Sequence, residues 1–423
     1  MARKMKDSGI EWIGEIPEGW EVAKLKNIVS IVRGGSPRPI EAYMSDNDND
    51  VNWIRISDTE KGSKYITHTS RKLIASGISK SRFIKRGSLI LTNSMSFGEP
   101  YILDIDGCIH DGWVAFSDFK KIDKEFLYYF LTSPLAKIQF EQQVDGGVVK
   151  NLNIDKIGDT VILLPSLIDQ NKIIAHLDSL TSETNSLLSK TITSIEEYKK
   201  LKQAVITQAV TKGVRGEREI KESKLPWASK IPKAWNICAI RHIMFECKER
   251  TKDSHEEQLS VTQQYGIIKS SDASIANPSL SLDDWRIVAI GDIVFNKYKA
   301  HSGVFFVSPF SGIVTFNYSV YRCFPNCYAK YFEYQYKTHG CISEFRTRMH
   351  GVGNSISPLY TKDLMKIKVV CPPLDEQKEI ANYLDAKCAE IDKLIAKKEQ
   401  LVKELESYKK SLIYEVVTGK REV

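Results

Sequence analysis

The sequence lacks the features that would place the chain in a membrane or in an oxidising compartment. No apolar run approaches the roughly 18 residues that a membrane-spanning helix needs. The opening segment MARKMKDSGIEW has no apolar core of the kind found in signal peptides. The eight cysteines show no short paired spacing in the first half of the chain, which favours reduced thiols over a disulfide framework. We therefore expect a cytoplasmic protein with no membrane partner.

Familiar catalytic signatures are also missing. The sequence has no phosphate-binding Gly-x-x-x-x-Gly-Lys-Ser/Thr, no His-Glu-x-x-His, no Gly-x-Ser-x-Gly, and no Gly-x-Gly-x-x-Gly after an expected strand. An Asn/Asp-Pro-Pro-aromatic motif of amino-methyltransferases and a Pro-Asp…Glu-x-Lys nuclease core are absent as well. We expect no catalytic residue in this chain, although an enzyme with an unrecognised active site stays open as an alternative.

One group of residues resembles a zinc site only superficially. Cys323 and Cys327 are followed by His339 and Cys341. The first pair is spaced more widely than in most zinc motifs, and His-x-Cys is an awkward second pair. The spacing therefore favours buried or idle thiols, and we expect no bound metal.

The net charge of +7 is modest, so its distribution matters more than its size. The segments Leu167–Gly213 and Leu374–Lys420 contain equal numbers of acidic and basic residues, so the whole excess lies in the rest of the chain. That distribution is a weak indication of a polyanionic partner. Charge alone favours an ordinary solvated surface.

The chain contains two copies of one plan. WIGEIPEGW (12–20) is matched by WASKIPKAW (227–235). LLPSLIDQNKIIAHLD (163–178) is matched by VCPPLDEQKEIANYLD (370–385) at an offset of 207 residues. GSLILT after residue 86 resembles GDIVFN after residue 290, and FLYYF resembles YFEYQY. Because self-similarity of this kind marks a repeat architecture, we expect two similar globular domains, each followed by a segment of different character.

Those following segments are predicted to be long helices. Apolar residues recur every three or four positions without internal Pro or Gly, which is typical of a coiled coil. About 45 residues at about 1.5 Å each give a helix of roughly 65 Å, which is too long to be buried in one small domain. We expect the two helices to pack on each other, with an uncertain register near a three-residue slip in the second. The predicted packing residues are Ile173, Leu177, Leu180, Leu187, Tyr198, Leu201, Ile380, Leu384, Ile391, Leu394, Leu401, Leu405 and Tyr408.

The globular parts show short β-like runs between loops rich in Gly, Ser and Asn, with a helical pattern over Lys124–Gln143. The expected fold is mixed α/β with an antiparallel-leaning sheet and a pseudo-two-fold internal repeat. The expected boundaries are a first globular domain at 1–165, a central helix at 166–213, a second globular domain at 214–372, and a C-terminal helix at 373–423.

Polar and basic loops recur at corresponding places in the two copies. RGGSPRP (33–39) carries two arginines, LTNSMSFG (91–98) follows an expected strand, and NKYKAHSG (296–303) occupies the corresponding place in the second copy. Each loop taken singly is more often an ordinary polar turn. Their recurrence favours a functional binding surface, because Arg, Lys and Asn side chains can bind the phosphates or base edges of nucleic acids. The candidate DNA-binding residues are Arg33, Gly35, Ser36, Arg38, Lys85, Thr92, Asn93, Ser94, Ser96, Lys297, Tyr298, Lys299, His301, Arg346 and Arg348.

With these motifs in view, the chain resembles the specificity subunit of a type I restriction-modification system over essentially its full length. The motifs that carry the resemblance are the Trp-(x)4-Pro-x-x-Trp segments, GGSP (34–37), WIRISD (53–58), and LPSLIDQ and PPLDEQ before the helices. The second copy lacks a GGSP loop, so contacts of Gly35, Ser36 and Arg38 are not transferred to it. The resemblance implies two target recognition domains joined by two long antiparallel coiled-coil helices.

The resemblance also implies how the protein works. Each recognition domain would bind one half of an asymmetric, bipartite double-stranded DNA site, and this chain would bind no cofactor itself. Two modification subunits would use S-adenosylmethionine to methylate adenine, and two restriction subunits, in systems that have them, would use ATP and Mg²⁺. The alternative from another class is a coiled-coil scaffold that binds only proteins, which predicts no salt-dependent affinity for DNA.

Overall fold

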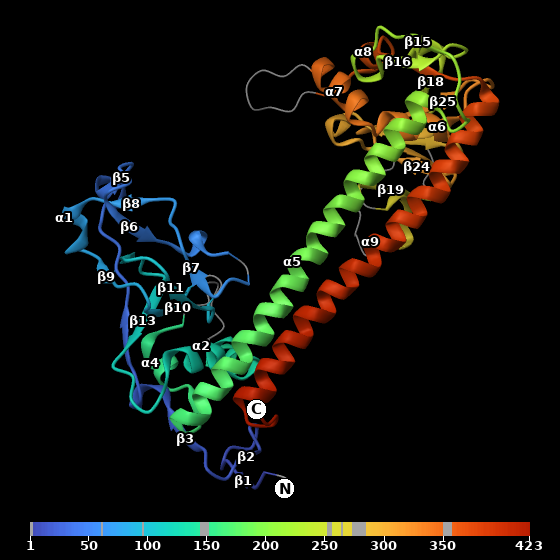
Figure 1. Cartoon of the computed structure of the whole chain (residues 1–423). Coiled ribbons are helices and arrows are strands. Elements are labelled where there is room, and N and C mark those ends of the chain that lie inside the picture. Colours follow the sequence, from blue (N-terminus) through green and yellow to red (C-terminus); the bar gives the residue numbers. More distant parts are fainter. Residues whose placement is uncertain are drawn as a thin grey trace. The chain divides into compact units, whose positions relative to one another are not determined.

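The computed structural model describes residues 3–60, 62–94, 97–143, 152–251, 256–263, 265–272, 285–349 and 358–423. The chain forms two compact units. Unit 1 comprises Met1–Ile192 together with Glu399–Val423, and unit 2 comprises Thr193–Lys398. The two longest helices, α5 (Leu167–Lys212) and α9 (Leu374–Val417), each contribute one part to each unit and lie close to the ranges expected from the sequence (Figure 1).

Unit 1 is built on two five-stranded sheets. Its other elements are β1 (Met5–Asp7), β2 (Glu15–Pro17), β3 (Glu21–Lys24), β4 (Ser30–Arg33), β5 (Met44–Ser45), β6 (Val51–Ile54), β7 (Tyr65–Ile66), β8 (Lys72–Leu73), α1 (Ala75–Ile78), β9 (Arg82–Ile84), β10 (Leu89–Thr92), β11 (Pro100–Leu103), β12 (Gly107–Ile109), β13 (Trp113–Ser117), α2 (Lys124–Thr132), α3 (Pro134–Gln143), α4 (Ile154–Gly158) and β14 (Val161–Leu164). The first sheet has the order β4-β13-β10-β11-β7, and the second has the order β5-β8-β6-β12-β9. Pairing is antiparallel except for β11 with β7 and β12 with β6.

Unit 2 repeats the centre of the first sheet. Its other elements are β15 (Ile220–Glu222), β16 (Lys230–Pro232), β17 (Asn236–Ala239), β18 (Met244–Cys247), β19 (Leu259–Thr262), β20 (Gly266–Lys269), β21 (Arg286–Val288), β22 (Ile293–Asn296), β23 (Phe305–Val307), β24 (Gly312–Val314), β25 (Tyr318–Cys323), α6 (Ala329–Tyr336), α7 (His339–Arg348), α8 (Thr361–Leu364) and β26 (Lys368–Cys371). The four-stranded order β18-β25-β22-β23 corresponds to β4-β13-β10-β11 of unit 1. The duplication and the mixed α/β class expected from the sequence are therefore present in the fold.

Two expected elements are divided in the structure. The helical pattern over Lys124–Gln143 forms α2 and α3, because Pro134 has no backbone N–H with which to continue α2. The apolar run GIVTFNYSVY forms β24 and β25, separated by a turn in which the Tyr318 amide donates to the Thr315 carbonyl over 3.0 Å.

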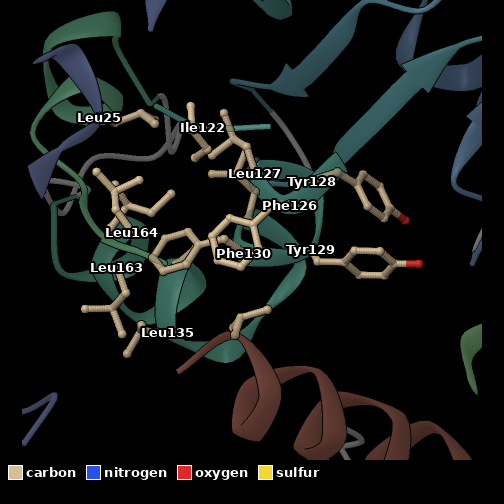
Figure 2. Close-up of a cluster of buried hydrophobic side chains, with 14 of the residues drawn as sticks. Leu25, Ile122, Phe126, Leu127, Tyr128, Tyr129, Phe130, Leu135, Leu163 and Leu164 are labelled. Atoms are coloured by element: carbon tan, nitrogen blue, oxygen red, sulfur yellow. The ribbon is translucent and has the colours of Figure 1, made fainter. Parts of the chain in front are cut away.

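The core of unit 1 is organised by α2. Phe126 and Phe130 are fully buried, and Figure 2 shows their rings on the side of Leu163 and Leu164 from β14. The ring of Tyr129 points the other way, with its hydroxyl directed outward from the cluster. The same core includes residues from the beginning of α5 and from the end of α9, so both helices are fixed to this unit.

The outward tyrosine of unit 1 has a counterpart in unit 2. The Tyr129 hydroxyl donates to Asp178 of α5 over 2.5 Å, and the Tyr334 hydroxyl of α6 donates to Asp385 of α9 over 2.6 Å. Burial and then the hydrogen bond to the carboxylate raise the pKa of each tyrosine, so both hydroxyls stay protonated and donate. Each unit thus joins its sheet-covering helix to the start of a long helix by the same bond.

Buried glutamines of the repeated Pro-x-x-x-x-Gln motif fix where the long helices begin. The Gln170 side-chain carbonyl accepts from the Asp123 amide over 2.7 Å, and its amino group donates to the Pro165 carbonyl over 2.9 Å. Gln377 makes the corresponding bonds to the Tyr328 amide and the Pro372 carbonyl. Both side chains are almost fully buried, so these bonds satisfy polar groups that would otherwise destabilise the fold.

Within each unit the segments of α5 and α9 run in opposite directions. In unit 1 the Lys409 ammonium donates to Asn185 over 2.7 Å, whereas earlier residues of α5 share a core with later residues of α9. In unit 2 Lys202 pairs with Asp392 at 2.6 Å, whereas later residues of α5 share a core with earlier residues of α9. Antiparallel packing is thus observed in each unit separately.

The buried stripe on the two helices differs from the expected packing set at five positions. Leu187, Leu201, Leu394, Leu401 and Tyr408 are 36–51% exposed, more than the other predicted packing residues. The other predicted packing residues are buried or half-buried. We correct the set accordingly: the stripe includes Thr181, Leu188, Ile195, Lys202, Cys388, Ile395, Val402 and Lys409, each one residue after a position expected from the pattern.

Threonines explain part of this difference. Thr181, Thr184 and Thr191 are buried, and each hydroxyl donates to the carbonyl of the residue four positions earlier over 2.6–2.8 Å. That bond satisfies the hydroxyl within the helix, so the methyl group can pack as an apolar surface. Thr181 lies one residue after an expected position, whereas Thr184 and Thr191 lie where the three-and-four repeat of the sequence places them.

Candidate nucleic-acid interface

The loop that follows β4 is held against the turn between β12 and β13. The Gly34 amide donates to the Trp113 carbonyl over 2.9 Å, and the Gly35 amide donates to the Ile109 carbonyl over 3.1 Å. A Cβ atom at Gly34 would lie 2.2 Å from the His110 carbonyl oxygen, so only glycine allows this approach. The close contact brings the side chains of the RGGSPRP loop to the β12–β13 turn.

Asp111 is the centre of the resulting polar cluster. Its carboxylate accepts from the Ser36 hydroxyl over 2.8 Å and from His110 Nε2 over 2.9 Å, and it lies 3.5 Å from the Arg38 guanidinium. Arg33 Nε donates to the Asp111 carbonyl over 3.0 Å. We call these five residues, Arg33, Ser36, Arg38, His110 and Asp111, the Asp111 cluster.

The electrostatics of the cluster keep Asp111 ionised. Burial raises the pKa of Asp111, but the Ser36 hydrogen bond, the interaction with His110 and the charges of Arg38 and Arg33 outweigh it and lower the pKa below its ordinary value. Burial is the main cause that lowers the pKa of His110. The His110 ring is therefore neutral at pH 7, with Nε2 donating to Asp111 and Nδ1 accepting from the Gly112 amide over 2.9 Å.

Arg38 is the cluster residue that is most available to a ligand. Its side chain is 75% exposed, and its ion-pair partner among the described residues is Asp111, at 3.5 Å. Arg82 of β9 extends the basic surface, because its Nε donates to the Arg33 carbonyl over 2.8 Å. An exposed guanidinium beside fixed hydroxyl and carboxylate groups has the chemistry to bind phosphates and base edges.

The LTNSMSFG loop contributes less surface than expected. Thr92 and Asn93 are 1% and 2% exposed, because β10 lies in the middle of the sheet, Thr92 is its last residue and Asn93 follows directly. The Thr92 hydroxyl accepts from the Glu99 amide over 2.9 Å. We therefore correct the candidate set by removing these two side chains. Ser94 is half-exposed, and Ser96 lies outside the described residues.

Lys85 is not brought to the Asp111 cluster. β9 pairs with β12 so that Arg82 is opposite Ile109 and Ile84 is opposite Gly107. Lys85 therefore follows the end of β9 that points away from the cluster. The structure separates it from the other basic candidates of unit 1.

Unit 2 presents its candidate loop directly after β22. The Lys297 ammonium donates to the Phe316 carbonyl over 3.4 Å and lies 5.6 Å from the centre of the Tyr298 ring. Tyr298 and Lys299 are exposed. Arg346, near the end of α7, donates to the His301 carbonyl over 3.4 Å, so α7 and the loop form one basic surface. Arg348 is half-buried on the same helix.

The two surfaces lie at equivalent ends of two corresponding sheets, one in each unit. In unit 1, Thr92 at the end of β10 is opposite Trp113 of β13, and in unit 2 Asn296 at the end of β22 is opposite Tyr318 of β25. The β12–β13 turn with Asp111 therefore corresponds to the β24–β25 turn with Phe316. Equivalent turns of the two sheets thus carry different side chains, the polar Asp111 in unit 1 and the aromatic Phe316 in unit 2.

The cysteine-rich segment of unit 2 shows no metal centre. Among the described residues no group of three or more His, Cys, Asp and Glu side chains is arranged to hold a metal ion. All eight cysteines are free thiols. Burial raises the pKa of Cys341 and of Cys323 to about 12, which makes both thiols poor metal ligands at neutral pH. In the described part of the chain, no helix is long and apolar enough to cross a membrane.

Comparison with known proteins decides the family. The family model described as type I restriction modification DNA specificity domain matches residues 17–197 and again residues 232–404. The chain belongs to this family of type I specificity subunits. The two matches cover most of the chain and fit the internal repeat. These are the specificity subunits of their systems rather than the catalytic ones.

Relatives of this specificity subunit extend over its whole length. A candidate type I restriction enzyme specificity subunit of Methanocaldococcus jannaschii, MjaX, is 25% identical over 96% of this chain and 95% of its own. The EcoKI specificity subunit of Escherichia coli K12 is 20% identical over 72% of this chain and 64% of its own. A chain solved in a study of complex assembly and conformational transition of the type I restriction-modification system shares the fold, with a TM-score of 0.71, 15% identity and coverage of 96% and 99%.

Four residues of these surfaces are not in the candidate set: Arg82, which lies in the basic segment KSRFIKRG (80–87), and His110, Asp111 and Phe316. The signal for two of them was present, because HDG between the apolar runs GCI and WVAF is typical of a turn between strands. Arg82 and Phe316 lie within apolar or mixed runs and reach the surface only through the pairing of the strands.

Proposed function

We propose that this specificity subunit binds double-stranded DNA and recognises an asymmetric bipartite target. Unit 1 binds one half-site through the Asp111 cluster, and unit 2 binds the other through Lys297, Tyr298, Lys299, His301 and Arg346. In this proposal residues 1–165 and 214–372 are the recognition domains, and residues 166–213 and 373–423 are the helices that join them. Recognition of the target directs adenine methylation, and restriction, by partner subunits.

The observation that carries the proposal is the correspondence of the two surfaces. Each unit contains the same four-strand arrangement. Loops at the equivalent end of that arrangement carry basic groups in both units, although the sequences of the loops differ. Conserved architecture with different surface chemistry is what two different half-sites require. Exposed arginine and lysine supply affinity for phosphates, and the fixed hydroxyl, carboxylate and ring groups supply discrimination between bases.

The helices are the proposed docking surface for two modification subunits. Four of the exposed apolar residues of α5 and α9 recur at the offset of the repeat: Leu187 corresponds to Leu394, and Leu201 corresponds to Tyr408. A repeated exposed apolar stripe fits two copies of one partner. We also propose that α5 and α9 form an antiparallel coiled coil. S-adenosylmethionine then belongs to the modification subunits, and ATP and Mg²⁺ belong to restriction subunits.

Salt-dependent DNA binding tests the proposal. The purified complex of this chain with its modification subunits is titrated with a target duplex and a scrambled duplex at several salt concentrations. The expected result is tighter binding to the target at every salt concentration, with affinity falling as salt rises. Equal, salt-independent weak signals for both duplexes would instead support the scaffold alternative.

A further inference from the structure

Unit 2 exposes aromatic rings where unit 1 has a half-buried carboxylate. Phe316, in the turn between β24 and β25, is 61% exposed, and Tyr298, in the loop after β22, is 41% exposed. Lys297 joins the two, because its ammonium donates to the Phe316 carbonyl and lies against the Tyr298 ring. The corresponding turn of unit 1 carries His110 and Asp111, which are tied into a polar network.

The chemistry around these rings points to a nucleic acid as their occupant. Phenylalanine has no polar group, so its exposure at the tip of a turn leaves apolar surface in water. Lys299 is exposed beside Tyr298, and Arg346 reaches the carbonyl of His301 in the same loop. Cations that surround exposed rings complement a polyanion whose bases have apolar faces. A purely apolar protein partner would not require these neighbouring positive charges.

We propose that Phe316 and Tyr298 form a wedge that stacks on bases of the half-site bound by unit 2 and partly unstacks one base step. The proposal rests on the proposed function and adds to it how this half-site is recognised. Unit 1 distinguishes bases by hydrogen bonds from the Asp111 cluster. Unit 2 distinguishes them in part by how easily the duplex opens at the step that the wedge enters. Pyrimidine–purine steps unstack most easily, so we expect one at that position.

The wedge also gives unit 2 a role in the reaction of its partners. Methylation of adenine requires the base to leave the stack, and a duplex that is already unstacked nearby costs less to open. The side chains of unit 2 would therefore lower the free energy that a modification subunit must supply at this half-site. Unit 1 has no exposed phenylalanine at the corresponding turn and would not give this help.

Fluorescence of 2-aminopurine tests the wedge directly. The target is first determined by mapping N6-methyladenine, and duplexes are made with 2-aminopurine at successive positions of each half-site. The complex is studied without S-adenosylmethionine, with Phe316→Ala and with Phe245→Ala as the matched control. Phe245 is also an exposed phenylalanine of unit 2, but it pairs with Arg322 at the far end of β25.

The expected result is a rise in fluorescence at one step of one half-site for the wild type and for Phe245→Ala. For Phe316→Ala that rise is lost, and the affinity falls about tenfold, which is the size of one lost base–aromatic stack. Phe316→Trp restores both signals because it keeps a ring. Lys297→Ala weakens binding and reduces the salt dependence, but the fluorescence rise remains at saturating protein.

Two outcomes overturn the wedge without affecting the proposed function. One is target-specific binding with no unstacked step, and the other is equal affinity and equal fluorescence for wild type and Phe316→Ala. If the wild-type complex binds target and scrambled duplexes equally, the proposed function itself fails. A loss of modification subunits from Phe316→Ala, with DNA binding unchanged, would assign the ring to a protein contact and also reject the wedge.

Discussion

The indole nitrogen of Trp235 donates a hydrogen bond of 3.0 Å to the carboxylate of Glu376. This bond links the second Trp-Pro-Trp segment to the first turn of α9, two parts of the repeat that are far apart in sequence. Glu376 also forms an ion pair with Arg218 at 2.6 Å, and the Arg218 guanidinium lies 5.2 Å from the centre of the Trp235 ring. In unit 1 the equivalent Trp20 is buried beside Arg3, but its indole nitrogen has no hydrogen-bond partner among the described residues.

The difference between the two tryptophans predicts a difference in stability. Trp235→Phe and Trp20→Phe remove the same volume from a buried site, but only Trp235→Phe removes a hydrogen bond to a charged group. We expect Trp235→Phe to lower the free energy of unfolding by about 1.5–3 kcal/mol more than Trp20→Phe does. Urea unfolding followed by circular dichroism measures both. Equal losses would mean that the bond to Glu376 contributes nothing beyond packing.

Glu333 predicts a pH dependence for unit 2. Its carboxylate is buried, lies 2.5 Å from Lys337 and 3.2 Å from Lys330, and accepts from the Val307 amide over 3.1 Å. Burial raises the pKa of Glu333, but the two lysines and the hydrogen bonds outweigh it and hold the pKa below 4.5. A depressed carboxyl pKa stabilises the fold above about pH 4.5, and that contribution is lost as the pH falls through the folded-state value.

The variant Glu333→Gln isolates this contribution. We expect it to be about 1–3 kcal/mol less stable than the wild type at pH 7, because it leaves the charges of two half-buried lysines without their partner. The difference should shrink as the pH falls below 4.5, since the wild-type carboxyl then becomes neutral as well. Glu222→Gln is the control, because Glu222 is exposed and 4.0 Å from Lys230. A gap between wild type and Glu333→Gln that does not change with pH would reject this account.

Asp111→Ala should separate affinity from specificity. The substitution releases Ser36, His110 and Arg38, which Asp111 holds in place, and it removes a negative charge from the surface. We expect tighter binding to scrambled DNA, and a ratio of target to scrambled affinity that falls by about 10- to 100-fold. Competition binding at fixed salt measures both values.

Asp104→Ala is the control for that experiment. It removes a carboxylate paired with Arg86 at 2.7 Å, near the end of β9 that points away from the Asp111 cluster. We expect the specificity ratio of this variant to stay at the wild-type value. If both variants lower the ratio equally, loss of surface charge explains the effect and the cluster has no special role.

The exposed leucines of α9 predict where the modification subunits bind. Leu394→Glu and Leu401→Glu place a charge on an exposed apolar position, so the fold should keep its stability while the partner interface loses its apolar contacts. Native mass spectrometry should show loss of bound modification subunit. Lys397→Glu changes the charge of an exposed neighbour and should keep the wild-type stoichiometry. Full assembly of both leucine variants would move the proposed interface off this stripe.

The sequence predicted the architecture because the repeat is carried by residues with strict packing roles. Gln170 and Gln377 recur because each is buried and makes the hydrogen bonds that fix the start of a long helix. The tryptophans recur because each fills part of a hydrophobic core. Helix limits followed from the same motifs. The facing residues were less predictable, because positions one residue after the expected ones, such as Thr181 and Lys202, are polar in sequence and still buried or half-buried on the stripe.

The exposed loops of the candidate site were predictable from the sequence, but the residues that pack beside these loops were not. Arg38 and Lys297 lie in glycine-rich or polar loops whose exposure the sequence indicates. Asn93 looked equivalent in sequence, but its position at the end of a central strand buries it. Asp111 joins Arg38 only because β12 and β13 place their turn against the Gly34 loop, and such a contact depends on long-range strand pairing that no local pattern encodes.

Mapping of N6-methyladenine across the genome of a host that carries this chain and its modification subunits tests the central claim most directly. The account predicts one asymmetric bipartite motif that vanishes when the chain is deleted. It further predicts that Arg38→Ala relaxes the sequence of one half of the motif and that Lys297→Ala affects only the other half. A methylation pattern that is the same with the chain, without it and with either variant would contradict the account.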